Sequence, residues 1–363
     1  MFRTQPHRVL LCVAGLMLGL VPSLALAADS KPPTPTVVAK APSPEAPASP
    51  AKATSKAETS APAASASPKR IAQATDATGL PTGVTAAEWV DLAQEYAWYE
   101  DWTQARRCLS AAAELDAGGP EAGVALALGA LTYGEAGDST NAALVLAKAR
   151  GDHAGDAVAA LCDAIQAWMD VIATWPAQGA VKAATPGLEQ TLANTAQQWK
   201  GSFTGGWAGL RLVEYYLHVG DADKATATCQ ALEKEYQTGL VAEEAVVLEA
   251  NAAHWVAKDL PKAKALYQQA AAQVQSPRLR LRALVYLVNL EIDQRECDDA
   301  LTVLANIDTE FAGRPGLPWA RLYRGNAAYR IGQWDLAHAD AQAFLATTPG
   351  TPSRPCATPS RSG

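Results

Sequence analysis

Several kinds of residue are scarce in this chain of 363 residues, and their scarcity argues against the common enzyme classes. It has 3 methionines, 4 phenylalanines and 5 histidines, and aromatic residues make up 7% of it. The motifs H-E-x-x-H, G-x-S-x-G, G-x4-G-K-[ST] and C-x-x-C do not occur, although zinc, serine, phosphate and redox chemistry commonly use them. We therefore expect no catalytic residue, no cofactor and no bound metal, and a protein that is not an enzyme.

Alanine and acidic residues are abundant in the chain. Hydrophobic residues reach 49%, and since few of them are aromatic, most of the surplus is alanine, which favours closely packed helices over strands. The net charge is −7, and residues 86–260 hold 24 acidic groups against 10 basic ones. Nucleic-acid binding needs clustered Lys and Arg. We therefore expect no nucleic-acid partner.

The first 27 residues have the pattern of a secretory signal. Arg3, His7 and Arg8 precede an apolar stretch from Val9 to Leu20, and Ala25–Ala27 supplies small residues for a cleavage site. We expect cleavage after Ala27, a periplasmic or secreted protein, and no integral membrane span after cleavage. The alternative is an uncleaved anchor, since Val9 to Ala28 is long enough to span a bilayer.

Residues 28–85 are expected to be a disordered tether. Between positions 29 and 80 the chain has nine prolines, fourteen alanines and no aromatic residue, so it has too little apolar surface to offset its chain entropy. Residues 351–363 are expected to be a disordered tail, in which Cys356 is exposed and able to pair with another chain. The other cysteines that follow the expected signal, Cys108, Cys162, Cys229 and Cys297, are expected to be lone buried thiols.

A repeated helical pattern begins at Ala86. Trp89, Leu92, Ala93 and Tyr96 lie on one face of a helix, and Ala105, Leu109 and Ala112 form the inner face of a second. Similar units begin near Gly123, Gly206, Glu244, Leu281 and Pro318.

This order of residues resembles the tetratricopeptide repeat, W-x2-L-G-x2-Y followed by A-x3-F. The resemblance implies an all-α fold, a right-handed α-solenoid of about seven helix hairpins over residues 86–350. Residues 151–205 fit poorly and are interpreted as an irregular hairpin with an insertion. Residues 206–350 are also similar to the repeats of bacterial envelope proteins of the outer-membrane-assembly and Tol-associated type.

The family's groove positions imply a partner-binding surface. Carried over to this chain, they give Gln94, Trp98, Glu214, His218, Trp255, Asn289, Asp293, Asn326 and Arg330. Asn289 and Asn326 hold the same repeat position, where two amides would clamp a peptide backbone, and Arg282 and Arg330 favour an acidic or C-terminal segment. The expected function is an exported interaction scaffold that binds extended segments of cell-envelope proteins.

Two alternatives stay open. An enzyme or ligand receptor would place its site in residues 151–205, around Asp152, His153, Asp156, Asp163 and Asp170, although a turn followed by a solvated helix face explains these residues equally well. An envelope spacer would instead meet peptidoglycan through the basic tether.

Further expectations concern single segments. Gly201–Trp207 reads as a flexible loop, and Trp89, Trp102 and Trp334 read as core residues. No terminal cap follows Leu345, so Phe344 and Leu345 are expected to be exposed and available for self-association.

Overall fold

The computed structural model describes residues 83–115, 117, 119–152, 155–174 and 185–347, all of which belong to the unit that includes Ile71–Gly363. The expected signal peptide (1–27), nearly all of the expected tether (28–85) and the expected tail (351–363), with Cys356, lie outside the described residues. Among the described helices, none combines the length and the apolar character needed to cross a membrane.

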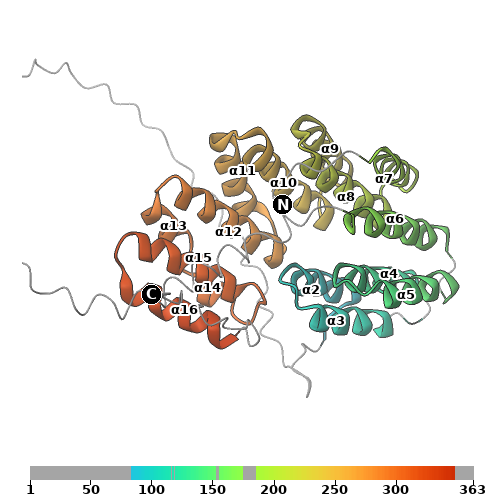
Figure 1. The fold of residues 1–363 in the computed structure, drawn as a ribbon, viewed down its shortest axis with the longest axis horizontal. Coiled ribbons are helices and arrows are strands. Elements are labelled where there is room, and N and C mark those ends of the chain that lie inside the picture. The colour runs from blue at the N-terminus through green and yellow to red at the C-terminus, as the bar shows by residue number, and fades with distance from the viewer. Residues whose placement is uncertain (1–82, 116, 118, 153–154, 175–184, 348–363) are drawn as a thin grey trace, which may run out of the picture. The chain divides into compact units, whose positions relative to one another are not determined.

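Seven pairs of helices follow one another along the chain (Figure 1). We number the pairs as hairpins 1 to 7: α2 (Ala86–Trp98) and α3 (Trp102–Leu115); α4 (Pro120–Glu135) and α5 (Ser139–Asp152); α6 (Asp156–Ile172) and α7 (Pro186–Gln198); α8 (Phe203–Val219) and α9 (Ala222–Tyr236); α10 (Leu240–Asn251), continued by η2 (Ala252–Ala257), and α11 (Leu260–Gln273); α12 (Pro277–Asp293) and α13 (Cys297–Val303) with α14 (Ile307–Glu310); α15 (Leu317–Arg330) and α16 (Trp334–Thr347). The described chain contains no strand, and the predicted all-α hairpin array is confirmed.

Small residues let the two helices of each hairpin pack closely. In α3, Ala105 and Ala112 are fully buried and Leu109 is 4% exposed. The equivalent residues of α11, Ala263, Tyr267 and Ala270, are all fully buried. Without bulk beyond Cβ at these alanines, the two helices can pack at the short end of the usual range of interaxial distances. The repeat pattern therefore predicted the inner faces of these second helices correctly.

The turn within a hairpin has the same local structure in six of the seven. One residue takes a positive φ, and the N–H of the next residue donates back to the end of the first helix, as Asp221 does to the Tyr216 carbonyl at 2.9 Å. The Asp221 side chain then accepts from the Lys224 N–H at 3.0 Å and caps the second helix. The positive-φ residues are Glu100, Gly137, Gly220, Lys258, Arg295 and Gly332.

The interval between the turns of hairpins 4 and 5 is one residue longer than the next two intervals. The positive-φ positions Lys258, Arg295 and Gly332 are 37 residues apart, whereas Gly220 and Lys258 are 38 apart. The end of the first helix of hairpin 5 is wound as a π-helix over Ala252–Ala257, and a π-turn accommodates one additional residue within a helix. The turn that follows keeps its register.

The expectation of a flexible loop at Gly201–Trp207 is wrong. Ser202 caps α8, and the residues after it are helical and mostly buried. A Cβ on Gly205 would lie 2.2 Å from the carbonyl oxygen of Trp199, and one on Gly206 would lie 2.6 Å from a methyl group of Val241. The missing side chains of these glycines allow α8 to lie against Trp199 and Val241. The glycines therefore serve close packing and not loop flexibility.

Of the other expectations for single residues, some are confirmed and some are wrong. The four described cysteines are free and buried, as predicted, and Trp89 is a core residue at 6% exposed. Trp334, expected in the core, is 60% exposed. Phe344 was expected to be exposed but is 1% exposed, because its ring packs edge-on against Trp319 at 4.8 Å; only Leu345, at 42%, is exposed as predicted.

Candidate functional site

The first helices of five hairpins surround a cavity of about 360 Å³. Its apolar wall includes Trp98 from α2, Leu128 and Leu131 from α4, and Trp207 and Leu210 from α8. Its polar wall comes from α2, α4, α8, α10 and α12 and includes Gln94, Glu135, Arg211, Glu214, Glu244, Arg278 and Arg282. The cavity therefore joins an apolar surface to a group of buried charges.

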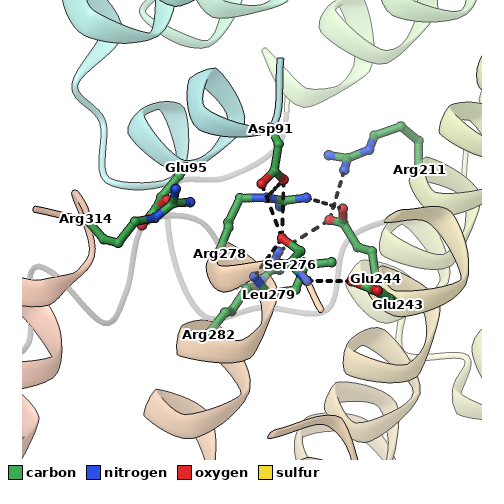
Figure 2. A network of polar contacts seen from close by, with 10 residues as sticks. All are labelled: Asp91, Glu95, Arg211, Glu243, Glu244, Ser276, Arg278, Leu279, Arg282 and Arg314. Atoms are coloured by element: carbon green, nitrogen blue, oxygen red, sulfur yellow. Dashed lines mark hydrogen bonds and ion pairs between the residues drawn. The ribbon is translucent and has the colours of Figure 1, made fainter. Parts of the chain in front are cut away.

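Glu244, in the second turn of α10, is at the centre of these charges (Figure 2). It is 4% exposed and accepts hydrogen bonds from Arg278 at 3.0 Å and Arg282 at 3.4 Å, with Arg211 at 3.9 Å. Burial alone would raise its pKa, but the guanidinium groups of Arg278, then Arg282 and Arg211, lower the pKa to about 2. Glu244 is therefore ionised at neutral pH.

Two further carboxylates complete what we call the central ion network: Asp91, Arg211, Glu214, Glu244, Arg278 and Arg282. Asp91 accepts from the Arg278 Nε at 2.8 Å, and Glu214 lies 2.6 Å from Arg211 Nη1, one turn away on α8. Buried charges are tolerated only when they are paired in this way. The network also ties α2 to α12 through Asp91 and Arg278, which are 187 residues apart along the chain.

Hairpin 1 contacts hairpins 6 and 7 at several more points. The Glu95 carboxylate forms an ion pair with Arg314 and accepts from the Gly316 N–H at 3.2 Å. Burial raises the pKa of Glu95, while Arg314 acts in the opposite direction. The Tyr99 ring stacks on that of Trp319, with centroids 6.0 Å apart. The first hairpin is therefore docked on the sixth and seventh, which closes the array at α2.

Trp98 contributes an aromatic face to the same junction. The guanidinium carbon of Arg282 lies 3.6 Å from the centroid of the Trp98 ring, and Tyr286 packs edge-on against that ring at 6.4 Å. A guanidinium group above an indole face is stabilised by the ring's quadrupole. Trp98 therefore holds Arg282 at the cavity wall.

The predicted groove residues fall into three groups. Gln94, Trp98 and Glu214, which the family positions predict to lie on the groove, line the cavity. His218 is half-buried near the end of α8, and Trp255 lies in the π-helical turn, stacked on His254 with ring centroids 3.9 Å apart. Asn289, Asp293, Asn326 and Arg330 form a separate surface on α12 and α15.

This second surface, which we call the asparagine strip (Asn289, Asp293, Asn326 and Arg330), lies at the C-terminal halves of two neighbouring first helices. Asn289 and Asn326 are half-exposed, while Asp293 and Arg330 are exposed. Arg330 Nη1 donates to the Ile292 carbonyl at 3.1 Å. Burial raises the pKa of Asp293, and the charge of Arg330 opposes part of this rise.

Because each asparagine precedes one of these charged residues by one helical turn, the four side chains lie on one side of the α12–α15 pair. α15 is held in place by Arg324, which donates to Asp340 at 2.6 and 2.8 Å and to Asp308 at 2.7 Å.

The alternative site in residues 151–205 gains no support from the described side chains. Asp152, Asp156, Asp163 and Asp170 are all exposed; Asp163 pairs with Arg150 at 2.6 Å, and Asp170 accepts from Gln166 at 2.7 Å. His153 lies outside the described residues. Elsewhere in the described chain, no group of three His, Cys, Asp or Glu side chains is placed to hold a metal ion.

Sequence reasoning missed most of the central ion network. Arg211, Arg278 and Asp91 were not proposed as site residues, and Glu244 was used only to mark the start of a repeat. One signal was available for two of these charges: Asp91 lies between Val90 and Leu92, and Arg211 lies between Leu210 and Leu212, and all four flanking residues are buried. A charge within an apolar face indicates a buried pair.

The fold and this site define a helical-hairpin repeat protein with a charged interior. Residues 209–351 match the family model of the tetratricopeptide repeat-like domain. The chain therefore contains a tetratricopeptide repeat-like domain over hairpins 4 to 7, and the predicted tetratricopeptide resemblance is confirmed.

Sixteen solved chains have a similar structure. One is a signal-transduction ATPase with numerous domains that carries a tetratricopeptide repeat sensor, from Pyrococcus horikoshii. It is 15% identical, with a TM-score of 0.43, over 72% of this chain and 41% of that protein. The chain thus spans less than half the length of that protein. The comparison with curated proteins gives no match.

Proposed function

We propose that this chain is an exported interaction scaffold that binds extended segments of cell-envelope proteins at the asparagine strip and catalyses no reaction. Proteins built from such hairpins present surfaces of regularly spaced side chains to a partner. The confirmed domain supports a role in protein binding, and the signal pattern at residues 1–27 supports export.

The observation that carries the proposal is the pair of amides at Asn289 and Asn326. They come from equivalent positions, 37 residues apart, on adjacent first helices, and both are half-exposed. Neither amide makes a hydrogen bond to any part of the described chain. An amide both donates and accepts, so two of them in a row match the alternating N–H and C=O groups of an extended peptide.

The closed junction at hairpin 1 indicates why the strip, and not the interior, is the proposed site for an extended segment that runs across several hairpins. Arg278 of α12 donates both to Asp91 of α2 and to Glu244 of α10. A peptide crossing this junction would have to break buried ion pairs, and each uncompensated buried charge is costly. The strip on α12 and α15 can be reached without that cost.

The charges of the strip favour a polar partner segment. Arg330 supplies a cation at one edge and Asp293 an anion beside it, so a segment carrying an acidic group opposite Arg330 gains a charge-assisted hydrogen bond. We infer an extended envelope-protein segment with at least one carboxylate.

Site-specific photo-crosslinking in the native host tests this proposal. A crosslinking amino acid at Asn326 is expected to capture a reproducible partner, whereas one at Lys148, exposed on α5, is expected not to capture it. Identical products from both positions, or none at Asn326, would contradict the assignment.

A matched pair of double variants tests the role of the amides. Asn289→Ala with Asn326→Ala removes the strip's amides, whereas Gln269→Ala with Gln273→Ala removes two exposed amides from α11. Only the first pair is expected to reduce partner capture, with helix content unchanged in both. Fractionation of the tagged host protein tests the proposed periplasmic or secreted location, and recovery in the cytoplasm would contradict it.

A further inference from the structure

The cavity between the first helices contains buried hydrogen-bond donors that nothing in the described chain satisfies. Arg211 is 7% exposed and Arg282 is 6% exposed, and the Nε–H group of each lacks a hydrogen-bond acceptor among the described residues. A buried donor left unsatisfied is costly, and native proteins rarely keep one without a reason.

Of the three arginines around Glu244, Arg282 has the fewest carboxylate partners to balance its charge. Arg278 has Asp91 as a second partner, and Arg211 has Glu214. Among the carboxylates of the described residues, Arg282 pairs only with the shared Oε1 of Glu244, at 3.4 Å; its other neighbours are the Trp98 and Tyr286 rings. A further anion beside Arg282 would therefore be stabilised.

The two arginines lie close together beside Glu244. Arg211 Nη2 and Arg282 Nη1 approach the same oxygen of Glu244, at 3.9 and 3.4 Å, although they come from α8 and α12, while the Nε–H group of each still lacks an acceptor within the described chain. Both residues line the cavity. Convergent guanidinium groups are a common means of binding carboxylates, because their N–H groups match carboxylate oxygens in pairs.

The rest of the cavity is suited to an apolar group. Leu128, Leu131, Trp207 and Leu210 form one wall, and Phe203, 38% exposed, also lines the cavity, so part of this wall lies at the protein surface. A volume of about 360 Å³ lies at the small end of the range for small-molecule sites. The apolar part therefore fits a chain or ring of modest size that enters past Phe203.

We propose that this cavity is a binding site for a carboxylate carried on an apolar group. The carboxylate lies between Arg211 and Arg282, with Trp98 behind Arg282, and the apolar group lies against Leu128 and Trp207. Two sources have this chemistry: a free medium-chain or aryl carboxylic acid, and the C-terminal residue of a protein that ends in a large apolar side chain. The site is distinct from the asparagine strip and does not depend on it.

Isothermal titration calorimetry of the full chain tests the proposal with matched probes. Octanoate and octanamide differ in charge but have the same apolar chain, and a short peptide ending in leucine is compared with its C-terminal amide. We expect saturable 1:1 binding of octanoate or of the peptide acid, with the neutral counterpart weaker by about tenfold or more. The acid that binds identifies the source.

Three variants place the site. Arg282→Gln is expected to weaken binding about tenfold or more. Arg280→Gln is its control on the same helix, since Arg280 is 30% exposed and pairs with Glu310 at 2.8 Å, away from the cavity lining; it is expected to bind as the wild type does. Ala97→Leu adds bulk to the lining without removing a charge and is expected to weaken binding while the thermal transition is retained.

Four results would overturn the proposal: no saturable binding of either acid, equal binding of the acids and their neutral counterparts, wild-type affinity in Arg282→Gln, or wild-type affinity in Ala97→Leu. Should Arg282→Gln fail to fold, the Ala97→Leu comparison and the acid–amide comparison in the wild type still decide the matter.

Discussion

Removing the charge of Glu244 is expected to destabilise the whole array, although the side chain keeps its size. In Glu244→Gln the three guanidinium groups of Arg211, Arg278 and Arg282 remain buried, but the carboxylate that they share is gone. A buried cation that loses its partner cannot be resolvated without opening the structure. The loss therefore exceeds that of an ordinary hydrogen bond.

The magnitude follows from the pKa of Glu244. A glutamate has an ordinary pKa of 4.5, and Glu244 has one of about 2, a difference that corresponds to about 3 kcal/mol of folding stability. Removing one partner of a buried ion pair typically costs about 3–5 kcal/mol, which agrees. Because the folded-state pKa is the lower one, this stabilisation is present above about pH 4.5 and is lost as the pH falls towards 2.

Urea unfolding followed by circular dichroism at 222 nm, at pH 7 and at pH 3, measures the effect. Glu310→Gln is the matched control, because it removes the same charge from a pair that is about 30% exposed and is expected to cost about 1 kcal/mol or less. We expect the deficit of Glu244→Gln to be about 3 kcal/mol at pH 7 and smaller at pH 3. A deficit at pH 7 no larger than that of the control, or one that does not shrink with acid, would refute the reasoning.

Other predictions concern the backbone and one imidazole. Gly205→Ala is expected to lower stability by about 1–3 kcal/mol in thermal melts, because its Cβ would overlap a carbonyl oxygen, whereas Gly151→Ala, with nothing within 4 Å, is expected to raise stability by up to about 1 kcal/mol. Arg295→Gly is expected to stabilise the protein by up to about 1 kcal/mol, because its φ is +66°, and unchanged or lower stability would contradict this. Burial lowers the pKa of His254 to about 4, so NMR titration is expected to show this imidazole still neutral at pH 5.5, and stability is expected to fall as the pH drops from 6.5 towards 4.

The helical array was predictable because its signals are local. Ala105, Leu109 and Ala112 are spaced at i, i+4 and i+7, so they lie on one face of any α-helix. The repeat spacing extended this pattern along the chain. Those three residues are buried as expected. Gln94 and Glu214, which the family pattern places on the partner-binding groove, line the cavity; their role in binding a partner stays a prediction.

The closure of the array was not predictable from local pattern. Asp91 and Arg278 are 187 residues apart, and no periodicity relates them; their pairing depends on how small rotations add up over successive hairpins. The burial of Phe344 against Trp319 and the exposure of Trp334 have a similar origin, because each depends on which neighbouring helix covers the side chain.

The wrong loop prediction at Gly201–Trp207 has a different cause. A cluster of glycines before a helix is typical of a loop, but Gly205 and Gly206 lie within α8, where close approach of Trp199 and Val241 leaves no room for a Cβ. The sequence shows that a side chain is absent and not why it is absent.

The most direct test of the structural account is whether hairpin 1 is docked on hairpin 6 through Asp91 and Arg278. A double-mutant cycle with Asp91→Ala and Arg278→Ala, measured by urea unfolding, isolates their coupling. The pair is bonded at 2.8 Å with side-chain exposures of 13% and 6%, so we predict a coupling of about 1.5–3 kcal/mol. Additive effects, within about 0.5 kcal/mol, would contradict the closed array and the charged interior that it encloses.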